Sequence, residues 1–133
     1  MSDIPSIAGL KVLVIDDSNT IRRSAEIFLG HAGCTVILAE DGFDALAKAA
    51  DHEPDLIFCD VLMPRLDGYQ ACALIKKSER LQHTPVVMLS SKDGLFDRAR
   101  GRLVGSEDYL AKPFSKDGLL RTVARYARRT VDA

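Results

Sequence analysis

Four places in the sequence carry side chains that together could bind a metal ion and a phosphoryl group. Asp16 and Asp17 follow one short apolar run, and Asp60, Ser90 and Lys112 each follow another. Carboxylates without histidine or cysteine partners favour Mg²⁺ or Mn²⁺ over zinc, and Mg²⁺ commonly binds carboxylates together with phosphate oxygens. A carboxylate can also act as a nucleophile, and an ammonium group can neutralise a phosphoryl oxygen. These residue types predict phosphoryl chemistry, provided that the fold brings them together.

Each of these residues also has a simpler interpretation when it is taken singly. Asp16-Asp17 is typical of a turn followed by a helix cap, Ser90 could cap the helix after it, and Lys112 could be a solvated surface lysine. The interpretation changes because all of them follow predicted strands. It is their joint placement that favours a shared site.

The elements that would position these residues are five predicted strands. Most of the apolar runs are rich in β-branched residues and continuous rather than alternating, which is typical of strands covered on both faces. The predicted strands are Lys11–Ile15, Thr35–Ala39, Asp55–Cys59, Pro85–Leu89 and Asp108–Ala111.

A helical pattern follows each predicted strand. The order strand–helix, repeated five times, predicts an α/β domain with a mostly parallel sheet and right-handed crossovers, whose ligands bind at the carboxyl ends of the strands. Ser18, Asp41, Asp93 and Ser115 are the predicted start signals, and Gly105 is the predicted end of the fourth helix. The predicted buried stripes are Ile21, Ala25, Phe28 and Leu29; Leu46, Ala49 and Ala50; Ala71, Leu74 and Ile75; Leu95, Ala99 and Leu103; and Leu119, Leu120, Val123 and Ala127.

The composition describes one ordinary domain. The chain has 133 residues and a net charge of −1, so no global field favours nucleic acid or an acidic membrane. Its start lacks the pattern of a signal peptide and no apolar run approaches a membrane span, so we expect a cytoplasmic protein. Cys34, Cys59 and Cys72 are odd in number and form no C-x-x-C, which favours buried thiols over a disulfide or zinc site.

Four segments of the sequence resemble the receiver domains of response regulators, typified by the chemotaxis protein CheY. They are V-L-V-I-D-D-S, D-L-I-F-C-D-V-L-M-P-R-L-D-G, T-P-V-V-M-L-S-S and Y-L-A-K-P-F. The resemblance implies a single receiver domain at residues 10–128, between a flexible terminus at 1–9 and a tail at 129–133, with no output domain. It also implies a (βα)5 flavodoxin-like fold with strand order 2-1-3-4-5 and helices on both faces of the sheet.

The resemblance assigns a role to each polar residue of the predicted site. It implies that Asp60 is the phosphoacceptor. It implies that Asp17, Asp60 and the backbone carbonyl of Leu62 bind Mg²⁺ or Mn²⁺ directly, and that Asp16 binds the ion through water. Lys112 would pair with the phosphoryl group.

The same resemblance implies a conformational switch. Ser90 would bond a phosphoryl oxygen, and Tyr109 would turn inward, which alters the face formed by the fourth helix, fifth strand and fifth helix. The Lys112–Pro113 peptide bond would be cis. Leu62 and Lys92 stand where the family tunes dephosphorylation. Because an apolar Leu62 cannot orient water, we expect slow to moderate self-dephosphorylation.

Longer segments, such as M-P-R-L-D-G-Y-Q-A-C-A-L-I-K, resemble stand-alone regulators of type IV pilus twitching motility. This resemblance implies a CheA-like histidine kinase as the phosphoryl donor. It also implies a downstream protein of the pilus machinery that binds the face formed by the fourth helix, fifth strand and fifth helix. From the net charge and the lack of a recognisable DNA-binding motif we expect neither nucleic-acid nor membrane binding. We also expect no enzymatic activity, and a monomer or a weak phosphorylation-dependent dimer.

Other classes of function stay open at this point. A Mg²⁺-dependent phosphatase that forms an aspartyl phosphate would carry a second aspartate at the position of Leu62, and the glycine-rich nucleotide-binding motifs are absent. A domain of this kind could also act as a phosphate sink for a shared kinase. An arginine-rich surface could be a solvated helix face, contact an acidic partner, or bind nucleic acid; it comprises Arg98, Arg100, Arg102, Arg121, Arg125, Arg128 and Arg129.

Overall fold

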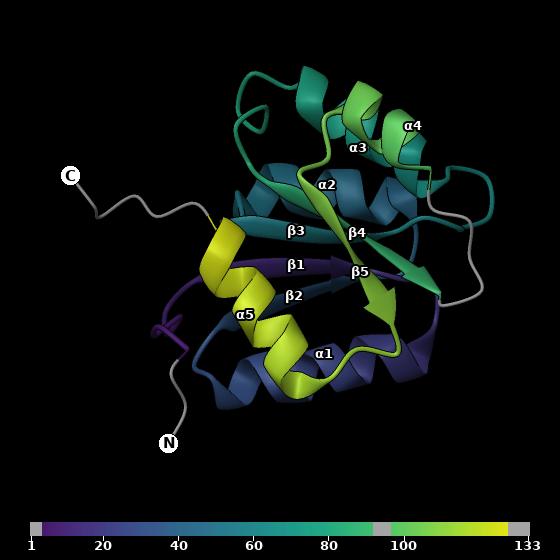
Figure 1. The fold of residues 1–133 in the computed structure, drawn as a ribbon. Helices are drawn as coiled ribbons and strands as arrows, with labels where there is room; N and C mark the ends of the chain where they lie inside the picture. Colours follow the sequence, from purple (N-terminus) through teal and green to yellow (C-terminus); the bar gives the residue numbers. More distant parts are fainter. Residues whose placement is uncertain (1–3, 92–96, 128–133) are drawn as a thin grey trace.

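The computed structural model describes residues 4–91 and 97–127, which form alternating strands and helices (Figure 1). The strands are β1 (Lys11–Ile15), β2 (Thr35–Ala39), β3 (Leu56–Asp60), β4 (Val86–Ser91) and β5 (Asp108–Lys112). The helices are α1 (Asn19–His31), α2 (Gly42–His52), α3 (Gly68–Lys77), α4 (Arg98–Val104) and α5 (Lys116–Tyr126).

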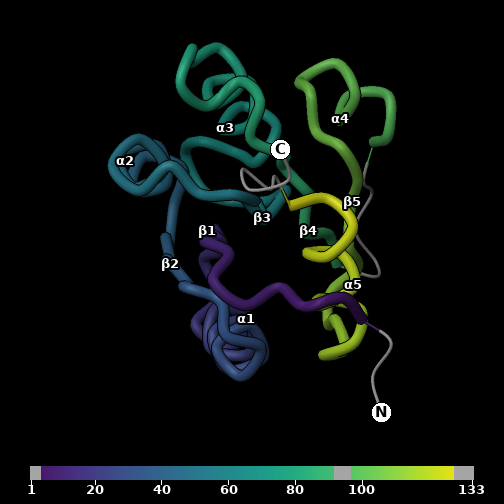
Figure 2. The backbone as a smooth tube through the Cα atoms, turned by 90° about the vertical axis from the view of Figure 1, so that its left-hand side faces the viewer, coloured from purple at the N-terminus to yellow at the C-terminus, as the bar shows by residue number. Residues whose placement is uncertain are grey.

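The strands form one parallel sheet in the order β2-β1-β3-β4-β5, which confirms the predicted topology. Figure 2 shows helices α1 and α5 on one side of this sheet and α2, α3 and α4 on the other. Parallel strands joined by helical crossovers leave all their carboxyl ends at one edge. The ends of β1, β3, β4 and β5 therefore meet there.

Successive residues of the central strands pack into two separate cores. Val12 and Val14 belong to the core beneath α1 and α5, whereas Leu13 and Ile15 belong to the core beneath α2 and α3. All four side chains are fully buried. Burial on both faces explains why the strands read as continuous apolar runs.

Short polar side chains begin the helices and place their first turns. Ser18, Asp41 and Ser115 each accept a hydrogen bond from a backbone N–H of the first turn, as predicted. Asp67 caps α3 in the same way, and its capping box with Gln70 fixes the start of that helix just after the loop that follows Asp60.

The prediction for the fourth helix was wrong in its start and in its buried stripe. The described helix begins at Arg98 behind the cap Asp97, and Asp93 and Leu95 lie outside the described residues. Ala99 is exposed and Leu103 is 86% exposed, while Gly101 is the buried residue of this helix. Apolar periodicity over so few residues does not determine which side of a short helix is buried. The predicted end was correct, because Gly105 takes the left-handed conformation there.

Two smaller predictions also need correction. Leu74, expected in the buried stripe of α3, is 43% exposed, and Ala50 of α2 is exposed too. Ile7, in the segment expected to be a flexible terminus, is buried in the core beneath α1 and α5. Across residues 4–91 and 97–127, no helix is long and apolar enough to cross a membrane.

Gly68 lies against the backbone of Asp60 at the point where α3 begins. A Cβ atom at this position would stand 2.2 Å from the Asp60 carbonyl oxygen. The Gly68 N–H also donates to the Val61 carbonyl at 2.9 Å. A backbone atom cannot swing aside as a side chain can, so this position requires glycine.

We predict that Gly68→Ala lowers the free energy of unfolding by about 3 kcal/mol, because overpacking against backbone displaces the end of β3. Denaturant unfolding measures this change. Gly30→Ala in α1 is the matched control, since a Cβ atom there meets nothing within 4 Å. The control should be neutral or stabilising by up to about 1 kcal/mol. Equal stability of the two variants would contradict the prediction.

Candidate functional site

Three carboxylates meet at the carboxyl edge of the sheet. Oxygen atoms of Asp16, Asp17 and Asp60 all lie within 4.8 Å of one another. Asp16 is fully buried and Asp60 is 4% exposed, while Asp17 is exposed. Asp16 and Asp17 follow β1, whereas Asp60 is the last residue of β3. Strand pairing thus joins residues that lie 44 positions apart in the sequence.

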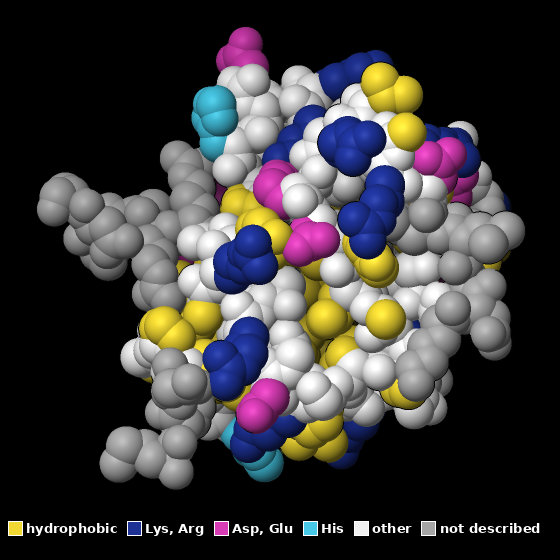
Figure 3. All heavy atoms as spheres, viewed as in Figure 1, with side chains coloured by type: hydrophobic (Ala, Val, Ile, Leu, Met, Phe, Trp, Pro, Cys, Tyr) yellow, Lys and Arg dark blue, Asp and Glu magenta, His cyan; other side chains and the backbone are white. Residues whose placement is uncertain are grey.

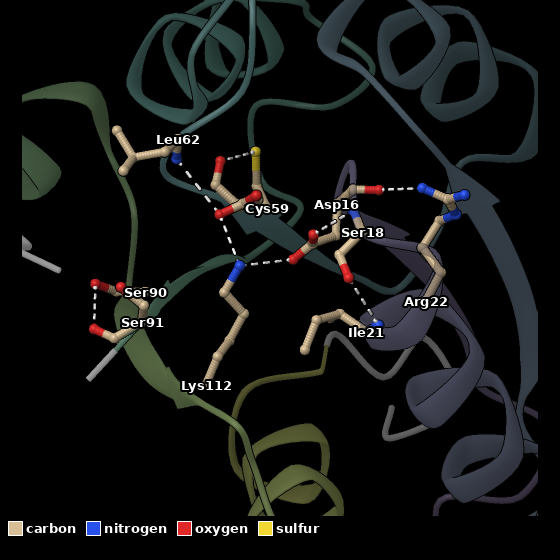
Figure 4. A network of polar contacts seen from close by, with 10 residues as sticks. Asp16, Ser18, Ile21, Arg22, Cys59, Leu62, Ser90, Ser91 and Lys112 are labelled. Atoms are coloured by element: carbon tan, nitrogen blue, oxygen red, sulfur yellow. Dashed lines mark hydrogen bonds and ion pairs between the residues drawn. The ribbon is translucent and has the colours of Figure 1, made fainter. Parts of the chain in front are cut away.

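Lys112 extends from the end of β5 into this cluster. Its Nζ atom lies 3.0 Å from Oδ2 of Asp16 and 3.0 Å from Oδ1 of Asp60. Figure 4 shows the ammonium group between the two carboxylates. The lysine side chain is 15% exposed, so this is a largely buried triad. Such groups are stable only when their charges are paired.

The electrostatics of the triad leave one negative charge in excess. Burial and the neighbouring Asp16 carboxylate raise the pKa of Asp60 to about 6, against the opposing effect of Lys112. Burial lowers the pKa of Lys112, but hydrogen bonds and charges from Asp16 and Asp60 outweigh it and raise that pKa overall. One cation therefore does not fully compensate the carboxylates, and further positive charge would favour their ionised form.

Backbone contacts fix the position of Asp16. Its N–H donates to the Ala39 carbonyl at 3.1 Å, and its Oδ1 accepts from the Ser18 N–H at 2.9 Å. Its carbonyl accepts from Arg22 at 2.5 Å. Sequence reasoning missed Arg22, because an arginine in the first turn of a helix carries no distinctive signal. It also gave Gly68 no role of its own, although that glycine stands in the M-P-R-L-D-G segment.

The remaining predicted residues have other partners or lie outside the described residues. Ser90 is buried, and its hydroxyl donates to the Ser91 carbonyl at 3.4 Å. The Leu62 N–H donates to Oδ1 of Asp60 at 3.4 Å, and Leu62 itself is 72% exposed. The Tyr109 hydroxyl accepts from Arg98 at 2.9 Å. Lys92 lies outside the described residues, and the Lys112–Pro113 peptide bond is cis.

The cysteines take no part in the cluster as ligands. Cys34, Cys59 and Cys72 are free thiols. Burial raises the pKa of Cys34 to about 11 and that of Cys72 to about 12. Burial also raises the pKa of Cys59, the neighbour of Asp60. All three are therefore neutral thiols near neutral pH, which is the protonation state of a structural cysteine.

The chemistry of the donor set fits a hard divalent cation. The cluster offers carboxylate oxygens and no nitrogen or sulfur ligand, which favours Mg²⁺ or Mn²⁺. Asp17 leaves the cluster open to solvent on one side, where water and phosphate oxygens can complete the coordination. Such an open, oxygen-lined site is typical of Mg²⁺ centres that handle phosphoryl groups.

Residues 12–124 match the response regulator receiver domain family. The chain belongs to this family. The match covers all five strands except Lys11, the first residue of β1. A receiver domain is one half of a two-component phosphorelay, so its partners are in general a histidine kinase and a downstream effector.

Individual relatives agree with this assignment. The receiver domain is 66% identical over 115 residues to Protein PilG of Pseudomonas aeruginosa, covering 86% of this chain and 85% of PilG. It is 37% identical to Response regulator MprA of Mycobacterium ulcerans over 92% of this chain, but spans only about half (52%) of that protein. Chemotaxis protein CheY4 of Vibrio cholerae superposes with a TM-score of 0.85 at 36% identity, covering 90% of this chain and 99% of CheY4.

We predict that Mg²⁺ stabilises the receiver domain through the carboxylate cluster. At about 100 times its dissociation constant, the ion should add about 2.7 kcal/mol to the free energy of unfolding. Thermal unfolding with and without Mg²⁺ measures this gain. Asp17→Asn should lose it, because the exposed ligand of the cluster is removed.

Asp51→Asn is the matched control, since Asp51 is an exposed aspartate of α2 outside the cluster. This variant should keep the full Mg²⁺ effect. Equal stabilisation of Asp17→Asn and Asp51→Asn would show that the ion binds elsewhere.

Proposed function

We propose that this receiver domain acts as a response regulator whose Asp60 accepts a phosphoryl group from a histidine kinase in a Mg²⁺-dependent reaction. The observation that carries the proposal is the position of Lys112, 3.0 Å from both Asp16 and Asp60. An ammonium group held at the phosphoacceptor is placed to neutralise a phosphoryl oxygen as the transfer proceeds.

In the proposed transfer, an Asp60 carboxylate oxygen forms a new bond to phosphorus while the nitrogen–phosphorus bond of the donor phosphohistidine breaks. Asp16, Asp17, Asp60 and the Leu62 carbonyl are the groups that would hold Mg²⁺, with Asp16 acting through water. The ion would neutralise charge on the phosphoryl oxygens. The domain is the substrate of its kinase and acts as a switch rather than as an enzyme with its own turnover.

The proposed switch follows from the charge that the phosphoryl group brings. Phosphorylation adds about −1.5 to −2 charge and new acceptor oxygens. Lys112 would re-pair with these oxygens, and the Ser90 hydroxyl, now on the Ser91 carbonyl, would turn to donate to one of them. Tyr109 would then move inward, which changes the face formed by α4, β5 and α5. The phosphoryl group shifts the population only as far as its interaction free energy differs between the two conformations of the domain.

Similarity to PilG supports a more specific proposal for the pathway. A CheA-like kinase would donate the phosphoryl group, and the effector would act on twitching motility. The aspartyl-phosphatase alternative finds no support in the site. Leu62, whose side chain is 72% exposed, stands where such a phosphatase would carry its second aspartate.

We predict that acetyl phosphate or a phosphorylated kinase adds one phosphoryl group to the wild-type protein only when Mg²⁺ is present. Intact-mass analysis measures the gain. Asp60→Asn should show no gain, because an amide oxygen is a poor nucleophile and an amide a poor Mg²⁺ ligand. Asp51→Asn should behave as wild type. A phosphoryl group on folded Asp60→Asn would refute the assignment of the acceptor.

We also predict that Leu62→Asn shortens the lifetime of the phosphorylated protein severalfold, because an amide beside Asp60 can orient the attacking water. Loss of the phosphoryl mass over time measures the lifetime. Leu103→Asn is the control, since Leu103 is exposed on α4 and the variant makes the same leucine-to-asparagine change in another element. An unchanged lifetime in Leu62→Asn would mean that another residue controls access of water.

A further inference from the structure

Arg22 is a half-buried arginine of helix α1 whose side chain points back toward the end of strand β1 (Figure 4). Figure 3 shows other Lys and Arg side chains standing out from the surface over α4 and α5. The Arg22 guanidinium is engaged instead: Nη1 donates to the Asp16 carbonyl at 2.5 Å, and Nη2 donates to Oδ1 of Asn19. The Arg22 N–H donates to the Ser18 carbonyl at 3.1 Å. These contacts tie the first turn of α1 to the residue that follows β1.

The carbonyl that Arg22 holds belongs to the peptide unit between Asp16 and Asp17. A peptide unit is planar, so a contact that fixes its oxygen also fixes the direction in which the chain enters Asp17. The Asp16 carboxylate has partners of its own, because it accepts from the Ser18 N–H at 2.9 Å and from Lys112 at 3.0 Å. Loss of Arg22 should therefore displace Asp17 more than Asp16.

Asp17 depends on its backbone more than the other two carboxylates of the cluster do. Among the ion pairs of residues 4–91 and 97–127, Lys112 contacts Asp16 and Asp60 but not Asp17. Asp17 is exposed, yet its carboxylate lies within 4.8 Å of the other two. An exposed side chain without the lysine contact takes its position from the backbone that carries it.

The ion that the cluster fits makes a small displacement of Asp17 important. Mg²⁺ requires near-octahedral geometry with short distances to its ligands, so it tolerates a displaced ligand poorly. Groups that orient a metal ligand without touching the metal commonly change its affinity about 10- to 100-fold. Arg22 is placed as such a group, because its contact lies on the peptide unit that leads into Asp17.

We propose that Arg22 is a positioning residue for the divalent cation: it holds the peptide unit between Asp16 and Asp17, and thereby keeps the Asp17 carboxylate where it binds Mg²⁺. This inference rests on the proposed function, which takes Asp17 as a direct ligand of the ion. Arg22 touches neither the ion nor the phosphoryl group in this role. Its removal weakens Mg²⁺ binding and leaves Asp60 in place.

Two other roles for Arg22 give different results. A cation beside the carboxylates repels Mg²⁺, so an effect of charge alone would make binding tighter when Arg22 is removed. A purely structural role would lower the stability of the ion-free protein and leave the affinity for Mg²⁺ unchanged. Only the positioning role weakens binding of the ion.

Thermal unfolding over a series of Mg²⁺ concentrations gives the dissociation constant and the stability of the ion-free protein from the same samples. Arg22→Gln should raise the dissociation constant about tenfold, because glutamine lacks the length and the paired donors of arginine. Arg22→Lys should recover part of the affinity, since lysine keeps the charge and the length but not the planar pair of nitrogens.

Arg23→Gln is the matched control. Arg23 is the next residue of α1, its side chain is 76% exposed, and its ion pair with Glu26 is long at 3.9 Å. This variant removes the same charge from the same helix turn and should bind Mg²⁺ as wild type does. A circular dichroism spectrum of each variant verifies that it is folded.

Two further variants test the route by which Arg22 acts. Asn19→Ala removes a partner of the guanidinium without changing Arg22, so it should weaken Mg²⁺ binding in the same direction but by less, even if Arg22→Gln did not fold. Asp17→Asn removes the ligand that Arg22 is proposed to position. Adding Arg22→Gln to Asp17→Asn should therefore change the dissociation constant far less than Arg22→Gln does alone. An undiminished further loss in this double variant would overturn the route through Asp17.

The wild-type titration separates this inference from the proposed function. No effect of Mg²⁺ on the wild-type protein would overturn the proposed function and this inference with it. If wild type binds Mg²⁺, unchanged or tighter binding by folded Arg22→Gln would overturn this inference alone. Lower stability of that variant at an unchanged dissociation constant would overturn it as well, since Arg22 would then only stabilise the fold.

Discussion

Lys112 lies between two buried carboxylates, and the arrangement of the sheet is what makes this position possible. Asp16 follows β1, Asp60 ends β3 and Lys112 ends β5, with β4 between the last two. A lysine can cross that interval because β4 ends in Ser90 and Ser91, whose side chains are small. If any one of the three charges moved away, a buried charge would be left without its partner. The parallel strand order is thus a condition for the charge balance of the site.

The backbone that follows Asp60 is also tightly packed. Gly68 touches the Asp60 carbonyl, and the next residue, Tyr69, is buried beneath the first turn of α4. The Tyr69 hydroxyl accepts from the N–H of Asp97 at 2.9 Å, and Arg100 lies 4.4 Å above its ring. The start of α4 therefore rests on the segment that follows Asp60.

The start of α4 has a second support in the Arg98–Tyr109 contact. One tyrosine belongs to α3 and the other to β5, so the helix is placed by two different elements. Within the described residues α4 is short and buries little apart from Gly101. A helix with so little buried surface of its own takes its position from its neighbours.

Most of the sheet and much of the site could be predicted from local patterns. Each central strand is apolar on both faces, so a few residues were enough to predict a strand. Strands Lys11–Ile15 and Thr35–Ala39 have the predicted bounds. The caps Ser18, Asp41 and Ser115 were readable because capping needs one oxygen at one position. The start and the buried residues of the fourth helix could not be predicted from its periodicity, because contacts with other elements, such as the one with the Tyr69 hydroxyl, position this helix.

The sequence by itself determined the order of the elements and which polar residues follow each strand, because both depend on residues that are close in the chain. The tertiary structure decided what those polar residues do to one another. The raised pKa of Asp60 and the two contacts of Lys112 arise from groups far apart in sequence. The need for glycine at position 68 arises from the Asp60 carbonyl, which the fold brings against it. Burial and distance set these interactions, and neither exists until the strands have paired.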